Sequence, residues 1–131
     1  MKANSDPGCV FCDIAAGTAP ATVLREWPDA LAIVPRGGCT PGHVLVIPRV
    51  HVRDAVSDPD VYGAVSRRAA QYAATIGSDC NLAVNCGPVA GQTVWHLHVH
   101  FIPRRPADGL PMPWTPQQEA ARAAAQNGAT A

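Results

Sequence analysis

The chain lacks a net charge, because its 131 residues include ten basic and ten acidic side chains and the formal charge is +0. Without a net charge, long-range electrostatic attraction does not bring the molecule to nucleic acid or to an anionic membrane, so any anion must be bound by a local group of residues. The chain also lacks an apolar run near the roughly 20 residues that a membrane helix needs. Neither nucleic acid nor a membrane is therefore an expected partner.

A signal sequence and an even set of cysteines are also missing. Residues 1–7 contain no apolar signal core, so we expect a cytoplasmic protein. The five cysteines cannot all pair within one chain, and a reducing compartment favours thiols or metal ligands over disulfides. With 11 glycines and 13 prolines, the composition predicts many turns but falls below the level that marks disorder.

Short apolar segments bounded by turn residues predict an α+β fold with an antiparallel five-stranded sheet. One main amphipathic helix is expected over residues 59–76, because Asp58 can cap it, Pro59 suits its first turn and Gly77 can end it. The five expected strands cover residues 22–27, 30–34, 43–48, 82–86 and 94–102.

The composition changes after residue 104, where prolines and then alanines dominate. We expect residues 1–105 to form one domain and residues 106–131 to form a Pro- and Ala-rich tail that packs on or near it. A short helix is expected in this tail, but burial of alanine side chains alone would stabilise it weakly.

Three histidines alternate with apolar residues in the expected fifth strand. Successive side chains of a strand point to opposite faces, so the histidines share one face and the apolar residues share the other. A single strand histidine is usually an ordinary polar residue, but three in register bring weak β-propensity to one face without a structural gain. We therefore interpret His96, His98 and His100 as functional residues.

The pair Cys9 and Cys12 has the spacing of a structural zinc clip. Tetrahedral zinc holds its nitrogen ligands about 2.0–2.1 Å away, whereas the outer two histidines of the triplet lie about 13 Å apart on a straight strand. At most two of the three could therefore share one metal, and two histidines would complete a Cys₂His₂ set. The alternatives are two inert cysteines or a redox dithiol, for which the sequence shows no preceding strand and following helix.

Three blocks of sequence resemble the histidine triad family. The most specific comprises Asn85 and residues 91–104, GQTVWHLHVHFIPR, in which the three histidines alternate with apolar residues. Residues 9–14 resemble the family's amino-terminal region, and residues 41–51, PGHVLVIPRVH, resemble its second block. The resemblance covers most of the chain up to residue 104 and implies the histidine triad fold.

The resemblance implies a nucleotidyl hydrolase or transferase, of the phosphoramidase or dinucleoside polyphosphate hydrolase type. His98 would attack the α-phosphorus of a nucleoside phosphoramidate or related nucleotide phosphate and form a covalent nucleotidyl-histidine, a role that suits an imidazole with an ordinary pKa near 6.5. His100 and His43 would contact the phosphate and the departing group. The implied substrate-binding residues, together with His100, are Asn85, Gly91, Gln92 and Thr93.

The resemblance also implies a cofactor and an assembly. The cofactor would be a structural zinc ion, with no ligand position open to substrate. Its implied ligands are Cys9, Cys12, His51 and His96. The assembly would be a homodimer, which could cover the strand edges and apolar surface that a domain of this size leaves open.

One position departs from the family pattern. An acidic residue that binds the ribose hydroxyls is expected after the second hairpin strand, and Pro35 stands there, followed by Arg36. Pro35 has no side-chain donor or acceptor, and Arg36 suits a phosphate more than a sugar. The alternative function is a non-catalytic nucleotide-binding or adaptor module. An RNA-binding domain with a zinc knuckle is disfavoured, because the chain has no basic face interleaved with aromatic residues.

Overall fold

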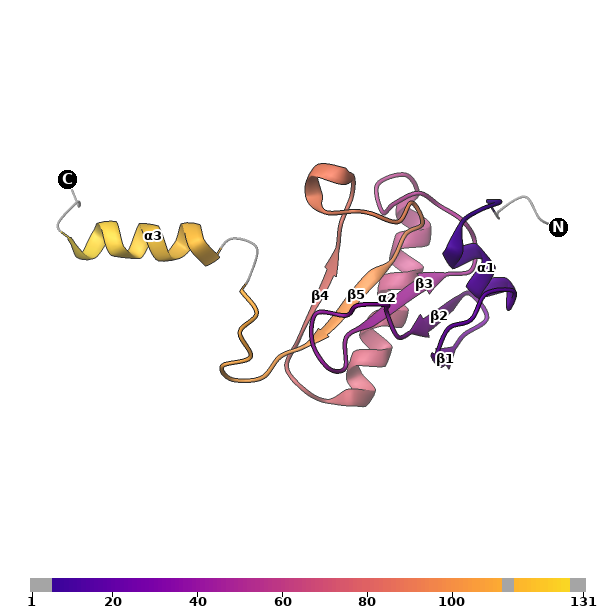
Figure 1. The fold of residues 1–131 in the computed structure, drawn as a ribbon, viewed down its shortest axis with the longest axis horizontal. Coiled ribbons are helices and arrows are strands. Elements are labelled where there is room, and N and C mark those ends of the chain that lie inside the picture. The colour runs from indigo at the N-terminus through magenta and orange to yellow at the C-terminus, as the bar shows by residue number, and fades with distance from the viewer. Residues whose placement is uncertain (1–5, 112–114, 128–131) are drawn as a thin grey trace.

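The computed structural model describes residues 6–111 and 115–127, and it confirms the predicted α+β fold. Its antiparallel sheet has the strand order β1-β2-β3-β5-β4 (Figure 1). The strands are β1 (Val23–Glu26), β2 (Ala30–Ile33), β3 (Val44–Pro48), β4 (Cys80–Val84) and β5 (Val99–Pro103). The strand that carries the last histidine of the triplet, β5, thus lies inside the sheet, between β3 and β4.

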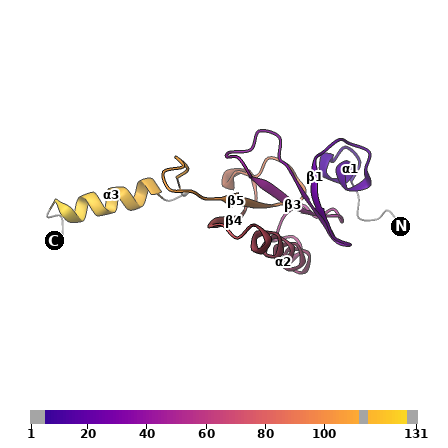
Figure 2. The same ribbon diagram turned by 90° about the horizontal axis from the view of Figure 1, so that it is seen from below.

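The helix α2 (Pro59–Ile76) covers one face of the sheet (Figure 2). The Asp58 carboxylate accepts a hydrogen bond of 3.1 Å from a backbone N–H of the first turn, and Gly77 ends the helix in the left-handed region at φ 77°. Helical spacing places Val65 and Ala69 against the sheet, where both are almost completely buried. The predicted main helix is therefore confirmed together with its capping residues.

A second helix, α1 (Val10–Ala16), lies on the opposite face and is absent from the sequence-based prediction (Figure 2). Cys9 is its N-cap, and the Cys9 sulfur accepts a hydrogen bond of 3.4 Å from the Cys12 backbone N–H. The inner side chains Phe11 and Ile14 pack on the apolar surface of β2 and β3. A helix this short depends on such packing rather than on propensity. Among the described residues no strand precedes the cysteine pair, and the helix begins within the pair, so the strand-then-helix arrangement of a redox dithiol is not found there.

The fifth strand is shorter than predicted, because β5 begins at Val99 instead of residue 94. In the irregular segment before it, the Leu97 N–H leaves the sheet pattern and donates to the Val52 carbonyl at 2.8 Å. The first two histidines of the triplet therefore precede the strand. Their rings still lie on the α1 side of the sheet, edge-on to Phe11.

The tail helix α3 (Thr115–Gln126) has no buried side chain and stands apart from the sheet in Figures 1 and 2. The division of the chain into residues 1–105 and 106–131 stays a prediction, and parts of both ranges lie outside the described residues. Within the described ranges, no helix combines the length and the apolar character needed to span a bilayer.

Candidate functional site

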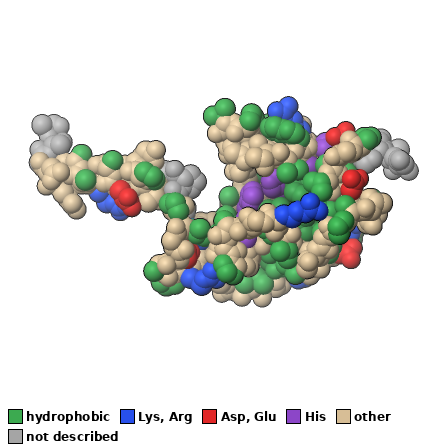
Figure 3. Space-filling view, viewed as in Figure 1, with side chains coloured by type: hydrophobic (Ala, Val, Ile, Leu, Met, Phe, Trp, Pro, Cys, Tyr) green, Lys and Arg blue, Asp and Glu red, His purple; other side chains and the backbone are tan. Residues whose placement is uncertain are grey.

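Two hollows meet at the histidine pair His43 and His100, which lines both of them. The larger, of about 880 Å³, is bordered by α1 and the loop after β2 and includes Thr93. The smaller, of about 720 Å³, lies along β4 and includes Asn85. Figure 3 shows histidine side chains in a hollow at the middle of one face of the molecule. A ligand bound at the pair could therefore extend in two directions.

The middle histidine of the triplet, His98, is oriented by the backbone of the first, His96. The side chain is largely buried, and its Nδ1 lies 2.8 Å from the backbone oxygen of His96. A carbonyl oxygen can only accept a hydrogen bond, so Nδ1 carries the proton and the Nε2 lone pair is free. The ring is held edge-on by Phe11 at 5.3 Å and by His100 at 5.0 Å between centroids. This arrangement gives His98 a fixed lone pair suited to nucleophilic attack.

In the neighbouring pair, His43 and His100, each ring carries its proton on Nε2, whereas His98 carries its proton on Nδ1. The Cys39 backbone N–H donates to His43 Nδ1 at 3.0 Å, so the proton of neutral His43 lies on Nε2. His43 Nε2 is 3.0 Å from His100 Nδ1 and donates to it, which leaves the His100 proton on Nε2. That atom is the one buried side-chain nitrogen or oxygen among the described residues that has no hydrogen-bond partner. A buried N–H without a partner is suited to bind an anionic ligand oxygen.

Burial keeps these three imidazoles neutral at pH 7. Loss of solvent lowers the pKa of His98 and, together with repulsion from His98, the pKa of His43. Burial also lowers the pKa of His100 to about 4, with smaller contributions from His98 and His43. Because the uncharged form of each ring predominates, the proton positions deduced from the hydrogen bonds describe the resting site.

The segment that precedes β5 brings two predicted substrate-binding residues beside this pair. Thr93 is exposed in the larger hollow, and Asn85 is half-buried in the smaller one. Gly91 adopts φ 97°, and a Cβ there would lie 3.4 Å from Asn85 Nδ2. Glycine therefore allows both the left-handed backbone and the close approach at this point.

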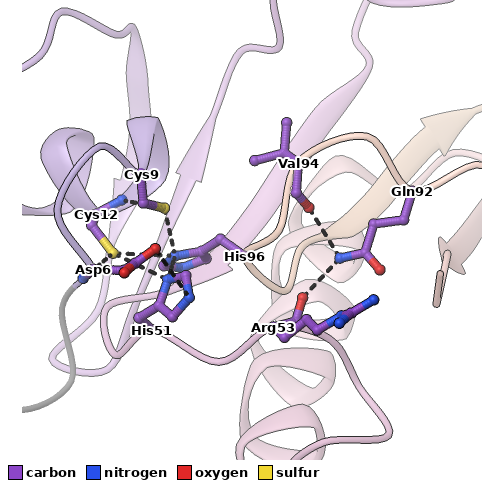
Figure 4. Close-up of polar contacts among 8 residues, drawn as sticks. All are labelled: Asp6, Cys9, Cys12, His51, Arg53, Gln92, Val94 and His96. Atoms are coloured by element: carbon purple, nitrogen blue, oxygen red, sulfur yellow. Dashed lines mark hydrogen bonds and ion pairs between the residues drawn. The ribbon is translucent and has the colours of Figure 1, made fainter. Parts of the chain in front are cut away.

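Gln92, in contrast, is engaged within the protein. Its Oε1 accepts from the Gly87 N–H at 2.8 Å, and its Nε2 donates to the carbonyls of Arg53 and Val94 at 2.7 and 3.0 Å (Figure 4). Both N–H groups are therefore used, and the side chain is only 3% exposed. In this structure Gln92 positions the loop, and its predicted contact with a phosphate stays a prediction.

A second cluster lies where the start of α1 meets the segment before β5 (Figure 4). Four potential ligand atoms, all within 4.8 Å of one another, come from Cys9, Cys12, His51 and His96. Three of the sulfur-to-nitrogen distances, Cys9 to His96 and Cys12 to each histidine, are 3.3–3.5 Å, and the two Nδ1 atoms are 3.2 Å apart. Tetrahedral zinc would separate a sulfur and a nitrogen by about 3.6 Å and two nitrogens by about 3.3 Å. The donor set and its spacing therefore fit zinc.

Outer contacts orient the two histidines of this cluster. His96 Nε2 is 2.9 Å from the Pro48 carbonyl and donates to it, so the Nδ1 lone pair faces the sulfurs. His51 Nε2 lies 3.9 Å from the Asp6 carboxylate. Burial raises the pKa of the Cys12 thiol to about 11, and a metal cation among these atoms would favour the thiolate instead.

Phe11 is a site residue that the sequence motifs do not identify. Its ring lies 5.7 Å from His96 and 5.3 Å from His98, so it contacts both the metal-type cluster and the triad. The three-residue spacing of Phe11 and Ile14, followed by Gly17, is typical of the inner side of a short helix and could have indicated it. The Cys39 N–H has no such signal, because almost every residue type supplies a backbone N–H.

Comparisons with known proteins identify the family to which the sequence is similar. The HIT domain family model matches residues 16–107. An uncharacterized HIT-like protein from Mycobacterium tuberculosis is 39% identical over 109 residues, which cover 78% of this chain and 75% of the relative. The adenylylsulfatase HINT3 from Arabidopsis thaliana is 37% identical over 108 residues, which cover 78% of this chain and 55% of that protein.

Solved structures also have the same fold. A Zn-bound histidine triad family protein from Mycobacterium smegmatis superposes with a TM-score of 0.69 at 37% identity, covering 95% of this chain and 98% of the other. A HIT family hydrolase from Clostridium thermocellum superposes with a TM-score of 0.72 at 31% identity, covering 83% of this chain and 99% of the other. The same fold thus occurs in a protein described as a Zn-bound histidine triad family protein and in one described as a HIT family hydrolase.

Proposed function

The chain belongs to the HIT, or histidine triad, domain family, and we propose that it hydrolyses a nucleoside phosphoramidate or a related nucleotide phosphate at the α-phosphate. The family includes a HIT family hydrolase and an adenylylsulfatase among the proteins similar to this chain, which supports a hydrolase. The observation that carries the proposal is the complementary pair of proton positions. His98 presents a lone pair, and His100 presents a buried N–H beside it.

The proposed reaction has two steps. In the first, His98 Nε2 forms a bond to the α-phosphorus while the bond from phosphorus to the leaving nitrogen breaks, and the departing amine takes up a proton from solvent. In the second, water cleaves the phosphorus–nitrogen bond, which releases the nucleoside monophosphate, returns the proton to solvent and restores neutral His98. In the covalent intermediate, the His98 ring carries a positive charge. Its Nδ1 proton stays hydrogen-bonded to the His96 carbonyl oxygen, and this hydrogen bond disperses the charge.

The remaining site residues act on the charge that develops at phosphorus. His100 Nε2–H is proposed to donate to a phosphate oxygen. His43 is proposed to fix the orientation of the His100 ring through its hydrogen bond to His100 Nδ1, and to lie near the departing group. Asn85 and Thr93 reach the phosphate from the two hollows, and Gly91 lets the backbone approach. Zinc would hold Cys9, Cys12, His51 and His96 together as a structural ion and supply no reaction step.

A hydrolysis screen tests this function directly. Nucleoside phosphoramidates and dinucleoside polyphosphates are incubated with the purified chain, and release of nucleoside monophosphate is followed by chromatography. Turnover of at least one class supports the proposal and identifies the leaving group. Binding of nucleotides without turnover would instead support the non-catalytic nucleotide-binding or adaptor module.

We expect Cys39→Pro to lower turnover about two- to tenfold, because it removes the N–H that fixes the His43 proton and one hydrogen bond contributes about 0.5–1.5 kcal/mol. Cys39→Ala keeps this N–H and is the matched control, with turnover close to that of the unmodified protein. Steady-state kinetics, with melting curves to show that both variants fold, measures the difference. An equal loss in the two variants would show that the backbone N–H has no such role.

The proposed assembly is a two-fold homodimer. β4 is an edge strand of the described sheet, because it pairs with β5 alone, and Leu82 at its centre is 45% exposed. An open strand edge with exposed apolar side chains is a surface that proteins usually cover. Sedimentation at micromolar concentration is expected to give twice the mass of the chain, and a species with the mass of a single chain would reject the dimer.

A further inference from the structure

Apart from two histidines, the larger hollow beside the triad is lined by one ionisable side chain. Its lining includes no aspartate, glutamate or lysine, and Arg36 is the one arginine. Arg36 is exposed, and within residues 6–111 and 115–127 it makes no hydrogen bond, ion pair or ring contact. A guanidinium that borders a hollow without a carboxylate to neutralise it is available to a ligand.

The loop between β2 and β3 places Arg36 close to the triad. A Cβ added at Gly38 would lie 3.2 Å from Pro35 Cγ and 3.3 Å from His43 Nδ1, so these two side chains flank the same point. The next residue, Cys39, is bonded to His43 through its backbone N–H. The loop is therefore anchored on the catalytic pair, and Arg36 follows directly after the proline that touches this point.

The lining of the hollow combines two kinds of side chain. An apolar surface suited to the flat face of a base is formed by Phe11, Ile14, Ile33 and Leu45. The His43 and His100 pair, where the reacting phosphate is proposed to bind, lines the same hollow. Along the wall beside that pair, Pro35 offers no acceptor for sugar hydroxyls, whereas Arg36 offers the paired N–H groups that match a phosphate.

We infer that the substrate is a nucleotide that carries a second phosphate, a monoester on the 2′ or 3′ oxygen of its ribose, and that Arg36 binds this group. The inference rests on the proposed function, because His98 and His100 already account for the reacting phosphate. The charge of Arg36 is then left for another anion on the same ligand. Arg36 thereby sets specificity without touching the reacting atoms.

Titration calorimetry with product-like ligands tests this assignment without requiring turnover. The ligands are adenosine 5′-monophosphate, adenosine 3′,5′-bisphosphate, adenosine 2′,5′-bisphosphate and adenosine 5′-diphosphate. One of the two bisphosphates is expected to bind at least about fivefold more tightly than the monophosphate, and the two ligands show which ribose oxygen is recognised. The preference is expected to shrink as salt rises, because Arg36 is exposed.

Arg36→Ala is expected to abolish this preference, and Arg36→Lys to retain part of it because it keeps the charge but not the planar pair of donors. Arg67→Ala, which removes an exposed arginine from α2 on the opposite face, is the matched control and is expected to keep the full preference. Affinities for the unmodified chain and the three variants are compared under one buffer condition.

Three results would overturn the inference. They are equal affinity of the unmodified chain for monophosphate and both bisphosphates, a preference that survives Arg36→Ala, and a gain for adenosine 5′-diphosphate as large as that for either bisphosphate. The last result would mean that Arg36 binds the departing side of a substrate. If phosphoramidates are hydrolysed without a bisphosphate preference, this inference alone fails. If the preference is found without any hydrolysis, the proposed function alone fails.

Discussion

His98→Ala is expected to reduce hydrolysis of a nucleoside phosphoramidate by at least about a thousandfold, because it removes the atom that forms the bond to phosphorus. The neighbouring His100 offers no substitute nucleophile. Its Nδ1 lies 3.0 Å from His43 Nε2 and its remaining nitrogen carries the proton, so neither ring nitrogen presents a free lone pair to the substrate. Single-turnover kinetics of the purified variant measures the loss.

The matched variant is His100→Ala, which removes a donor to the phosphate but leaves the nucleophile in place. Its turnover is expected to fall by about ten- to a thousandfold, less than for His98→Ala. Rapid acid-free quenching with a nucleotide labelled at the α-phosphate is expected to trap a histidine adduct in the unmodified chain and none in His98→Ala. Substantial activity in His98→Ala, or rapid turnover without an adduct, would contradict the covalent route.

The alternation of the triplet predicted the side on which the histidines lie, although the strand itself is shorter than expected. The reason is that the Leu97 N–H is hydrogen-bonded to the Val52 carbonyl, and the Leu97 side chain packs in the core between the sheet and α2. The residues on either side of Leu97 therefore face α1. Burial of apolar side chains thus keeps side chains alternating between the two faces even before β5, where the sheet hydrogen bonds are absent. An alternating sequence pattern therefore predicts which side chains are buried, but it does not predict where the strand's hydrogen bonds begin.

Three features of the site depend on how the chain folds locally or in three dimensions, and the sequence motifs did not predict them. The Cys39 N–H that fixes His43 belongs to a turn with no distinctive side chain. The short α1 is stabilised by packing on β2 and β3. Gln92 is identified by its motif, but its bonds to Arg53 and Val94 are set by where the loop folds. Motif spacing gives residue identity, whereas hydrogen-bond partners come from tertiary structure.

Cys12→Ser is expected to lower the melting temperature by at least about 10 °C and to reduce bound zinc together with it. Loss of one thiolate from a four-ligand site removes several kcal/mol, and each kcal/mol corresponds to about 2–8 °C for domains of roughly this size. Cys39→Ser is the matched control, because Cys39 is exposed and lies outside the cluster. Elemental analysis and melting curves, each with and without a chelator, measure both quantities. A freshly purified chain without metal, or melting unaffected by chelation, would reject the zinc site.

The same variant is also expected to lower turnover, because His96 belongs to both sites. Its Nδ1 faces the two sulfurs at 3.4 and 3.5 Å, while its backbone oxygen accepts the His98 Nδ1–H at 2.8 Å. Loosening the metal cluster therefore releases the carbonyl that fixes the proton of the nucleophile, and Phe11, which contacts both rings, loses the same support. The loss should appear in kcat more than in KM, since Cys12, His96 and His98 do not line the ligand hollow and Phe11 is the one residue of this group that does. Unchanged kcat in a zinc-free, folded Cys12→Ser protein would show that the two sites are independent.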